Sequence, residues 1–177
     1  MVGMPVRQHR TLAAVAARLD VLPEVAGAVL VGSLAAGTAD AASDVDLLVC
    51  AASGQFESAW ARRTELHVTG ALVSWDDGPR PGAQTAVHRW VTDDVVLVEA
   101  LFTVAGSGVR LAEPWRVIAG AAEVWTSFRA RPPIDRAEFD RAEAHPVDRA
   151  FAELKRALRG VPGGRPLRAT RRARRPG

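Results

Sequence analysis

The N-terminal third of the chain shows one helical and two strand-like patterns of apolar residues. Within residues 8–20, four apolar side chains recur at helical spacing: Leu12, Val15, Ala16 and Leu19. They predict an amphipathic helix that ends before Pro23. Two apolar runs, 28–31 and 45–50, follow and flank a segment rich in Gly, Ala, Ser and Thr. This arrangement predicts a strand, a turn with a short helix, and a second strand.

The middle of the chain alternates helical and strand patterns. Residues 54–65 predict a helix, and the sequence DDGPRPG at 76–82 predicts a turn. Three further strands are predicted over 67–75, 85–91 and 95–102. The last two are separated by Thr92, Asp93 and Asp94, which have the composition of a hairpin turn.

Helical patterns return near the C-terminus. We expect helices over 115–128 and 135–158, and a disordered tail where Gly, Pro and Arg replace periodic apolar residues. The fold class is therefore α/β (α+β), with a short C-terminal helical appendage. The expected divisions are a core over 1–110, the appendage over 111–160 and the Arg-rich tail over 161–177.

The composition is that of a soluble globular protein, with 48% hydrophobic and 24% charged residues. The net charge is +3, but six Arg residues lie in the last thirteen positions, so residues 1–164 are mildly acidic. A single cysteine, Cys50, excludes an internal disulfide and favours a reducing compartment, so we expect a cytoplasmic protein. The N-terminus lacks a signal-peptide pattern, and no apolar run is long enough to span a membrane.

Two acidic residues open the second apolar strand. Asp44 and Asp46 alternate with Val45, Leu47 and Val49, so the two carboxylates face one side and the apolar side chains face the core. Carboxylates held so close repel each other unless a cation compensates them. Mg²⁺ prefers oxygen ligands and binds one or two carboxylates together with substrate phosphates, so this pair predicts a metal and nucleotide site.

Gly32 and Ser33 follow the first strand, and ten residues separate Ser33 from Asp44. A glycine allows close approach of the backbone to a phosphate, and a Ser at a helix start adds its hydroxyl to free amide donors. We expect the triphosphate to bind at this turn.

The segment GSLAAGTADAASDVDLLV resembles the signature of the DNA polymerase β-like nucleotidyltransferases, in particular minimal nucleotidyltransferases and aminoglycoside nucleotidyltransferases. The resemblance covers residues 26–50. It implies the polymerase β-like nucleotidyltransferase fold, a mixed β-sheet flanked by helices. It also implies two Mg²⁺ ions, bound by Asp44 and Asp46, and nucleotide contacts at Gly32 and Ser33. It also implies transfer of a nucleoside monophosphate, with AMP from ATP favoured, to a hydroxyl of a small molecule or protein.

Such enzymes usually carry a third carboxylate, and Glu99 is the best candidate for a metal ligand and catalytic base. It interrupts the apolar run 95–102, where a charge needs a partner. The structural alternative is an ion pair with an Arg such as Arg89. Asp76, Asp77, Asp93 and Asp94 are weaker candidates because they lie in predicted turns.

Several functional alternatives stay open. The chain could have an antitoxin-like role toward a helical toxin protein, or be a non-catalytic nucleotide-binding or interaction module. The short C-terminal part could leave the acceptor site to be completed by a homodimer or a partner protein. Binding of nucleic acid by the Arg-rich tail is disfavoured because no aromatic residues are interleaved with its arginines.

Overall fold

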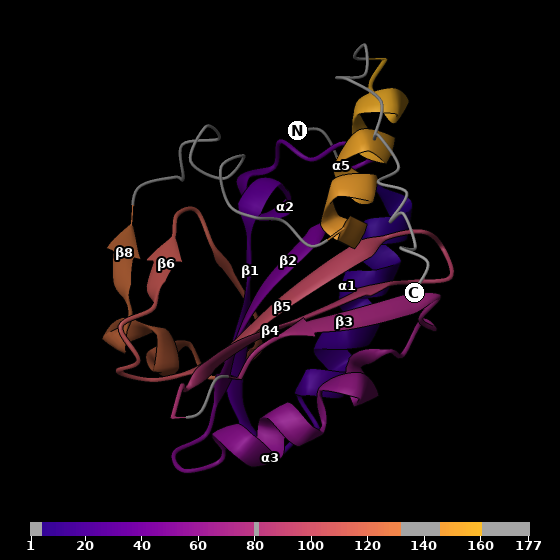
Figure 1. Cartoon of the computed structure of the whole chain (residues 1–177). Coiled ribbons are helices and arrows are strands. Elements are labelled where there is room, and N and C mark those ends of the chain that lie inside the picture. The colour runs from indigo at the N-terminus through magenta and orange to yellow at the C-terminus, as the bar shows by residue number, and fades with distance from the viewer. Residues whose placement is uncertain (1–4, 80–81, 132–145, 161–177) are drawn as a thin grey trace, which may run out of the picture. The chain divides into compact units, whose positions relative to one another are not determined.

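The computed structural model describes residues 5–79, 82–131 and 146–160. They fall into two units, which we describe separately. The first unit is built on a six-stranded mixed sheet with the strand order β3-β4-β5-β2-β1-β7 (Figure 1). Its strands are β1 (Val25–Val31), β2 (Val45–Ala51), β3 (Val73–Asp77), β4 (Thr85–Val91), β5 (Leu97–Val104) and β7 (Arg116–Gly120). Strands β2 and β5 are parallel, and the other neighbours are antiparallel.

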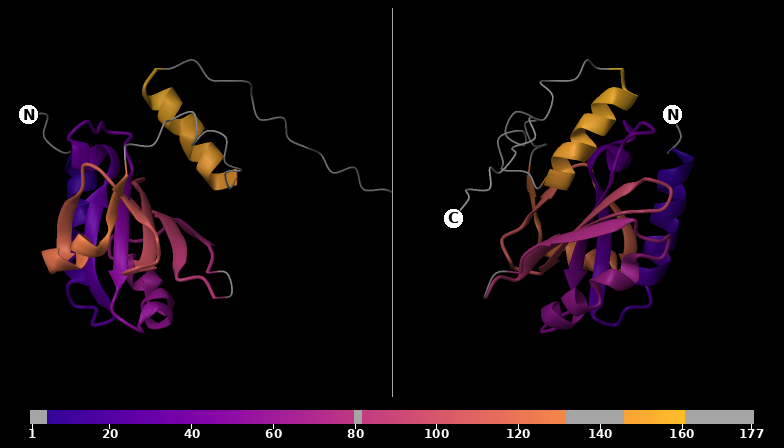
Figure 2. Two further views of the ribbon diagram at one scale, coloured as in Figure 1. Left: turned by 90° about the vertical axis from the view of Figure 1, so that its left-hand side faces the viewer. Right: turned by 45° about the vertical axis from the view of Figure 1, so that its right-hand side comes forward.

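Helices flank this sheet, which confirms the expected fold class. Figure 2 shows α1 running alongside the strands. The helical elements of the first unit are α1 (Val6–Leu19), α2 (Gly32–Ala36), α3 (Phe56–Ala61), and the 3₁₀ helices η1 (Arg63–Leu66) and η2 (Ala122–Ser127). Two short strands, β6 (Arg110–Ala112) and β8 (Arg129–Arg131), pair in parallel beside the main sheet.

The two faces of the sheet are covered differently. On one face, apolar side chains of α1, α3 and η1 pack against alternate residues of the strands, including Val45, Leu47 and Val98. On the other face, Leu48 and Cys50 pack with Trp125 of η2 and with Leu111 of β6. Trp125 and Leu111 thus cover the C-terminal part of β2 on this face. The other end of that face carries the polar residues described below.

The expected helix over 115–128 is wrong. Its first half is β7, which pairs with β1 at the edge of the sheet, and its second half is η2. The apolar run Val117, Ile118 and Ala119 is compatible with an edge strand as well as with a helix. The local sequence does not indicate that this run pairs with the distant strand β1. The sheet thus continues past residue 110, where we had placed the end of the core.

The expected strand over 67–75 and the turn over 76–82 are displaced. The strand begins only at Val73, because Gly70 adopts a positive φ of 78° in a preceding turn. It continues through Asp76 and Asp77, which pair with residues of β4. The hairpin turn at 92–94 is confirmed by the backbone hydrogen bond from the Val95 N–H to the Thr92 carbonyl.

The described part of the second unit is helix α5 (Pro146–Leu158), which lies within the expected helix over 135–158. The first eleven residues of that expected helix and the predicted tail over 161–177 lie outside the described residues. The three-part division of the chain remains a prediction.

Candidate active site

The turn between β1 and α2 brings Gly32 against the carboxylate of Asp46. Gly32 has a φ of 69°, and a Cβ placed on it would lie 2.4 Å from Oδ2 of Asp46. Asp46 is paired with Val31, the residue before Gly32, across the antiparallel ladder of β1 and β2. A glycine is required here both by the backbone conformation and by the space that the carboxylate occupies.

The loop before Asp44 is held by its own side chains. The Asp40 carboxylate accepts hydrogen bonds from the Ala42 N–H at 3.0 Å and from the Ser43 hydroxyl at 3.0 Å. The Ser43 hydroxyl in turn accepts from the Asp40 N–H at 2.9 Å. This closed set of contacts fixes the chain just before the acidic pair, so Asp40 and Ser43 have a positioning role that the sequence did not reveal.

Helix α1 supplies a second support for this loop. The side-chain amide of Gln8, which is 1% exposed, donates to the carbonyls of Ala41 at 3.1 Å and Ser43 at 3.0 Å. Gln8 lies one helical turn before Leu12, on the apolar face of α1. A polar residue on that face was the signal in the sequence that could have marked it.

Glu99 lies beside Asp46 on the neighbouring strand. The parallel register pairs Asp46 with Glu99, and the antiparallel register pairs Glu99 with Arg89 of β4. Residues paired in this way face the same side of a sheet. Nε of Arg89 donates to Oε2 of Glu99 at 2.6 Å. The structure therefore contains the ion pair that we had considered as the alternative to a catalytic Glu99.

Two carboxylates and one guanidinium, those of Asp46, Glu99 and Arg89, form a row on the sheet face opposite to the helices. We call it the carboxylate row. Their neighbours along the strands, including Val45, Leu47 and Val98, are buried in the core under α1 and α3. The predicted alternation along β2 is thus confirmed for its apolar positions. The Glu99 side chain is 32% exposed and that of Arg89 is 15% exposed. The row is accessible from solvent at its acidic part.

Within the three described segments, no three His, Cys, Asp or Glu side chains lie close enough together to hold a metal ion. The backbone register brings Asp46 and Glu99 to adjacent positions, whereas the Glu99 carboxylate is bonded to Arg89. The assignments of Asp44, Asp46 and Glu99 as metal ligands and of Gly32 and Ser33 as nucleotide-binding residues remain predictions.

Comparison with known protein families identifies the domain. Residues 12–81 match the family model described as nucleotidyltransferase domain, a span that includes Gly32, Ser33, Asp44 and Asp46. Residues 12–81 are thus similar to a nucleotidyltransferase domain. This confirms the resemblance to the polymerase β-like superfamily. No curated protein matches the sequence. Among the described residues, no helix has the length and apolar character needed to cross a membrane.

Asp93 and Asp94, which were weaker candidates for the third carboxylate, have structural partners. Asp94 accepts from Arg10 at 3.2 Å, and the carboxylate of Asp93 lies against Gly70. Trp90 is fully buried in the core, away from the carboxylate row. Trp75 is paired with Arg89 and is therefore on the same face as the row.

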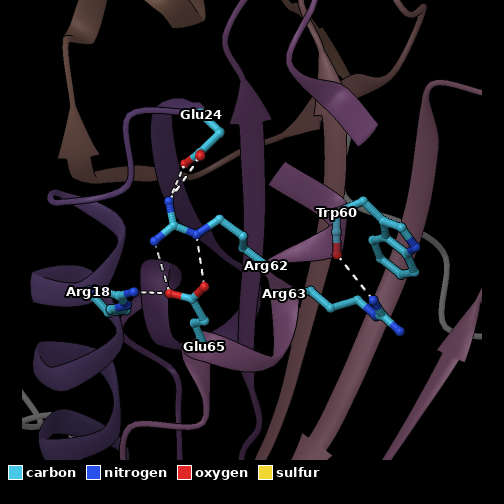
Figure 3. Close-up of polar contacts among 6 residues, drawn as sticks. All are labelled: Arg18, Glu24, Trp60, Arg62, Arg63 and Glu65. Atoms are coloured by element: carbon cyan, nitrogen blue, oxygen red, sulfur yellow. Dashed lines mark hydrogen bonds and ion pairs between the residues drawn. The ribbon is translucent and has the colours of Figure 1, made fainter. Parts of the chain in front are cut away.

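Arg62 forms ion pairs that account for its position near the end of α3. Its guanidinium contacts both oxygens of Glu24, at 2.9 and 2.8 Å, and both oxygens of Glu65, at 2.8 and 3.1 Å (Figure 3). Arg18 of α1 also contacts Glu65. Hydrogen bonding by Arg62 lowers the pKa of Glu24 below its ordinary value. These contacts join η1 to α1 and to the start of β1.

A polar cluster on the helix-covered face links Arg63, Asp76 and two histidines. Arg63 makes two-pronged contacts with Asp76, with Nη2 to Oδ2 at 2.8 Å, and lies over the ring of Trp60. Nδ1 of His88 lies 2.7 Å from Oδ1 of Asp76, and the Nε2 atoms of His88 and His67 are 2.8 Å apart. Asp76 is thus on the opposite face from Asp46.

Burial dominates the ionisation of this cluster. It lowers the pKa of His88, which is 1% exposed, although Asp76 opposes the shift. Burial, with a contribution from His88, also lowers the pKa of His67. For Asp76, burial opposes ionisation, but hydrogen bonds from Arg63 and His88 outweigh it and hold the pKa of the carboxyl below its ordinary value. The cluster therefore favours neutral histidines and an ionised Asp76.

Proposed function

We propose that the chain is a Mg²⁺-dependent enzyme that transfers a nucleoside monophosphate from an NTP to a hydroxyl acceptor. ATP is the favoured donor, and the acceptor is a small molecule or a protein. The observation that carries this proposal is the position of the Asp46 carboxylate, which touches the Gly32 turn on one side and is in register with Glu99 on the other. This arrangement lies in a chain whose residues 12–81 are similar to a nucleotidyltransferase domain.

The residues present suit Mg²⁺ and a triphosphate. Asp44, Asp46 and Glu99 offer only carboxylate oxygens, which are the ligands that Mg²⁺ prefers. The missing side chain at Gly32 lets the Asp46 carboxylate lie directly against the backbone of the turn. When bound, Mg²⁺ would neutralise charge on the triphosphate and on the departing pyrophosphate. We assign Asp44 and Asp46 as its principal ligands.

In the proposed reaction, the Gly32 turn on one side of Asp46 and Glu99 on its other side have separate roles. The acceptor hydroxyl oxygen forms a bond to the α-phosphorus, and the bond from that phosphorus to the pyrophosphate oxygen breaks. The hydroxyl proton passes to the carboxylate of Glu99, and pyrophosphate leaves with the electron pair. We assign the amides and hydroxyl of Gly32 and Ser33 to hold the triphosphate. The acceptor then approaches from the β5 side of the site.

The test uses purified protein with Mg²⁺ and each of the four α-labelled NTPs, with and without cell extract. We expect label on an extract component, with release of pyrophosphate, and no transfer by Asp44→Asn/Asp46→Asn protein that retains its fold. Circular dichroism and thermal unfolding would establish that the double variant is folded. Label transfer that is unaffected by this substitution would refute the assignment of the acidic pair.

A non-catalytic module is distinguished by the same experiment. A folded wild-type protein that binds Mg²⁺ and NTP but transfers no label to any component would support nucleotide binding without transfer. The antitoxin-like alternative predicts label on one helical protein that copurifies with the chain. Only the second result would also identify the class of the partner.

A further inference from the structure

Arg89 and Asp46 lie on opposite sides of Glu99 in the carboxylate row. Glu99 of β5 is in register with Asp46 of β2 and with Arg89 of β4. Its carboxylate is bonded on the β4 side, by the 2.6 Å contact from Nε of Arg89 to Oε2. Arg89 is the more buried partner, with a side chain 15% exposed. The backbone position of Glu99 thus allows it to share a site with Asp46. Its carboxylate, however, is hydrogen-bonded to Arg89 on the other side.

The charges of the row explain this arrangement. Asp46 of β2 and Glu99 of β5 are at adjacent positions, and Asp44 comes one residue before β2. Carboxylates held close together repel each other without a cation. Arg89 supplies a fixed positive charge from within the sheet. A guanidinium is always charged and makes strong hydrogen bonds to carboxylates. A Mg²⁺ ion bound with the nucleotide would bring positive charge to the same carboxylates and would take the place of the ion pair.

We propose that Arg89 is a positioning residue that competes with the metal–nucleotide complex for the carboxylate of Glu99. In the free protein Arg89 holds Glu99 on the β4 side. When metal and nucleotide bind, the Arg89–Glu99 contact breaks and Glu99 turns toward Asp46. Release of the products restores the ion pair. This inference rests on the proposed function, because it concerns the occupancy of the same site.

The first test follows the ion pair in the wild-type protein. In isotope-labelled protein, the Nε–H resonance of Arg89, assigned with Arg89→Lys, reports its hydrogen bond to Glu99. We expect this resonance to move to the position of a free guanidinium on saturation with Mg²⁺ and a non-hydrolysable ATP analogue. An unchanged resonance at saturation would overturn the proposal.

The second test is a double-mutant cycle on metal affinity. Binding of Mn²⁺ in the presence of the same ATP analogue is measured by electron paramagnetic resonance. Loss of the competing arginine in Arg89→Gln should tighten Mn²⁺ binding by about three- to tenfold. In a Glu99→Gln background the same substitution should have no effect, because the arginine acts through that carboxylate.

Arg63→Gln is the matched control, because Arg63 forms a comparable ion pair with Asp76 on the opposite face of the sheet. It should leave Mn²⁺ affinity unchanged. A tightening by Arg89→Gln that persists in the Glu99→Gln background would show a general charge effect and overturn the proposal. Wild-type protein that binds no Mn²⁺ with any of four NTP analogues would overturn the proposed function itself, and this inference with it.

Discussion

The carboxylate of Asp46 occupies the space where any side chain at residue 32 would begin. A Cβ on Gly32 would lie 2.4 Å from Oδ2 of Asp46, which is far inside contact distance. Gly37, at the other end of α2, has nearly the same φ, 70° compared with 69°, but a Cβ there would meet nothing within 4 Å. Substitutions at the two glycines can therefore distinguish the effect of backbone strain from the effect of displacing the Asp46 carboxylate.

We predict that Gly32→Ala abolishes nucleotidyl transfer, whereas Gly37→Ala preserves it. Both substitutions place a Cβ in a left-handed conformation, which costs about 1–2 kcal/mol. Only Gly32→Ala must also move Asp46. Chemical denaturation would measure the shared loss of stability, and the labelled NTP assay would measure transfer. Equal activity of the two variants would show that the position of Asp46 next to the turn is unimportant.

Gln8 should contribute to both stability and activity. Gln8→Leu removes two hydrogen bonds to the loop before Asp44 and leaves the carbonyls of Ala41 and Ser43 without that donor. We expect a loss of about 1–3 kcal/mol in the free energy of unfolding and a lower rate of transfer. The loss of transfer should persist below the unfolding transition, because the loop is displaced even in the folded protein.

Thr11→Val is the control for Gln8. Thr11 is buried on the same helix, and within the described residues its hydroxyl has no hydrogen-bond partner. An isosteric apolar side chain removes a buried polar group, so stability should be unchanged or higher and transfer unaffected. Both variants can be compared by urea denaturation. Equal losses of stability would mean that the hydrogen bonds of Gln8 are not the reason for its burial.

The alternation of side chains along β2 could be predicted because its signal is local. Asp44 and Asp46 lie three residues or fewer from the apolar positions that set their side of the strand, and the alternation fixes which face they share. The ion pair between Arg89 and Glu99 joins two residues of one hairpin. Contacts within a hairpin depend on a short loop, whose length sets the register.

Distant pairings could not be predicted in this way. The run 117–119 forms a strand because β1 offers it an open edge about ninety positions earlier in the chain. Gln8 reaches the loop before Asp44 from α1, a contact between residues 33 to 35 positions apart. Such contacts depend on how elements pack, and a polar residue on an apolar helical face indicates only that some partner exists.

The histidine cluster should make stability depend on pH. Burial lowers the pKa of His88 and His67 in the folded protein below the ordinary value of 6.5. Below pH 6.5 the unfolded chain binds protons that the folded chain does not, so stability falls as the pH decreases toward the folded pKa values. Above pH 6.5 this contribution is fully present. Urea denaturation between pH 8 and pH 5 would measure the slope.

His88→Asn should reduce that slope, because the residue no longer titrates. His9→Gln is the matched control, since His9 is exposed and lies outside the cluster. The two variants are compared across the same pH range at constant ionic strength. A slope that is equal in wild-type protein and in His88→Asn would contradict the assignment of the pH dependence to the cluster.

Arg62 should stabilise the fold without binding nucleotide. Its guanidinium is fully engaged with Glu24 and Glu65, so Arg62→Ala leaves two carboxylates without their main partner (Figure 3). We expect a lower unfolding temperature, with a smaller difference from wild type at high salt because these contacts are partly exposed. Affinity for the Mg²⁺–ATP analogue should not change. Arg62→Lys keeps the charge but loses the two-sided contact, so its stability should lie between the other two proteins. A loss of nucleotide affinity in folded Arg62→Ala protein would instead assign this arginine to a phosphate site.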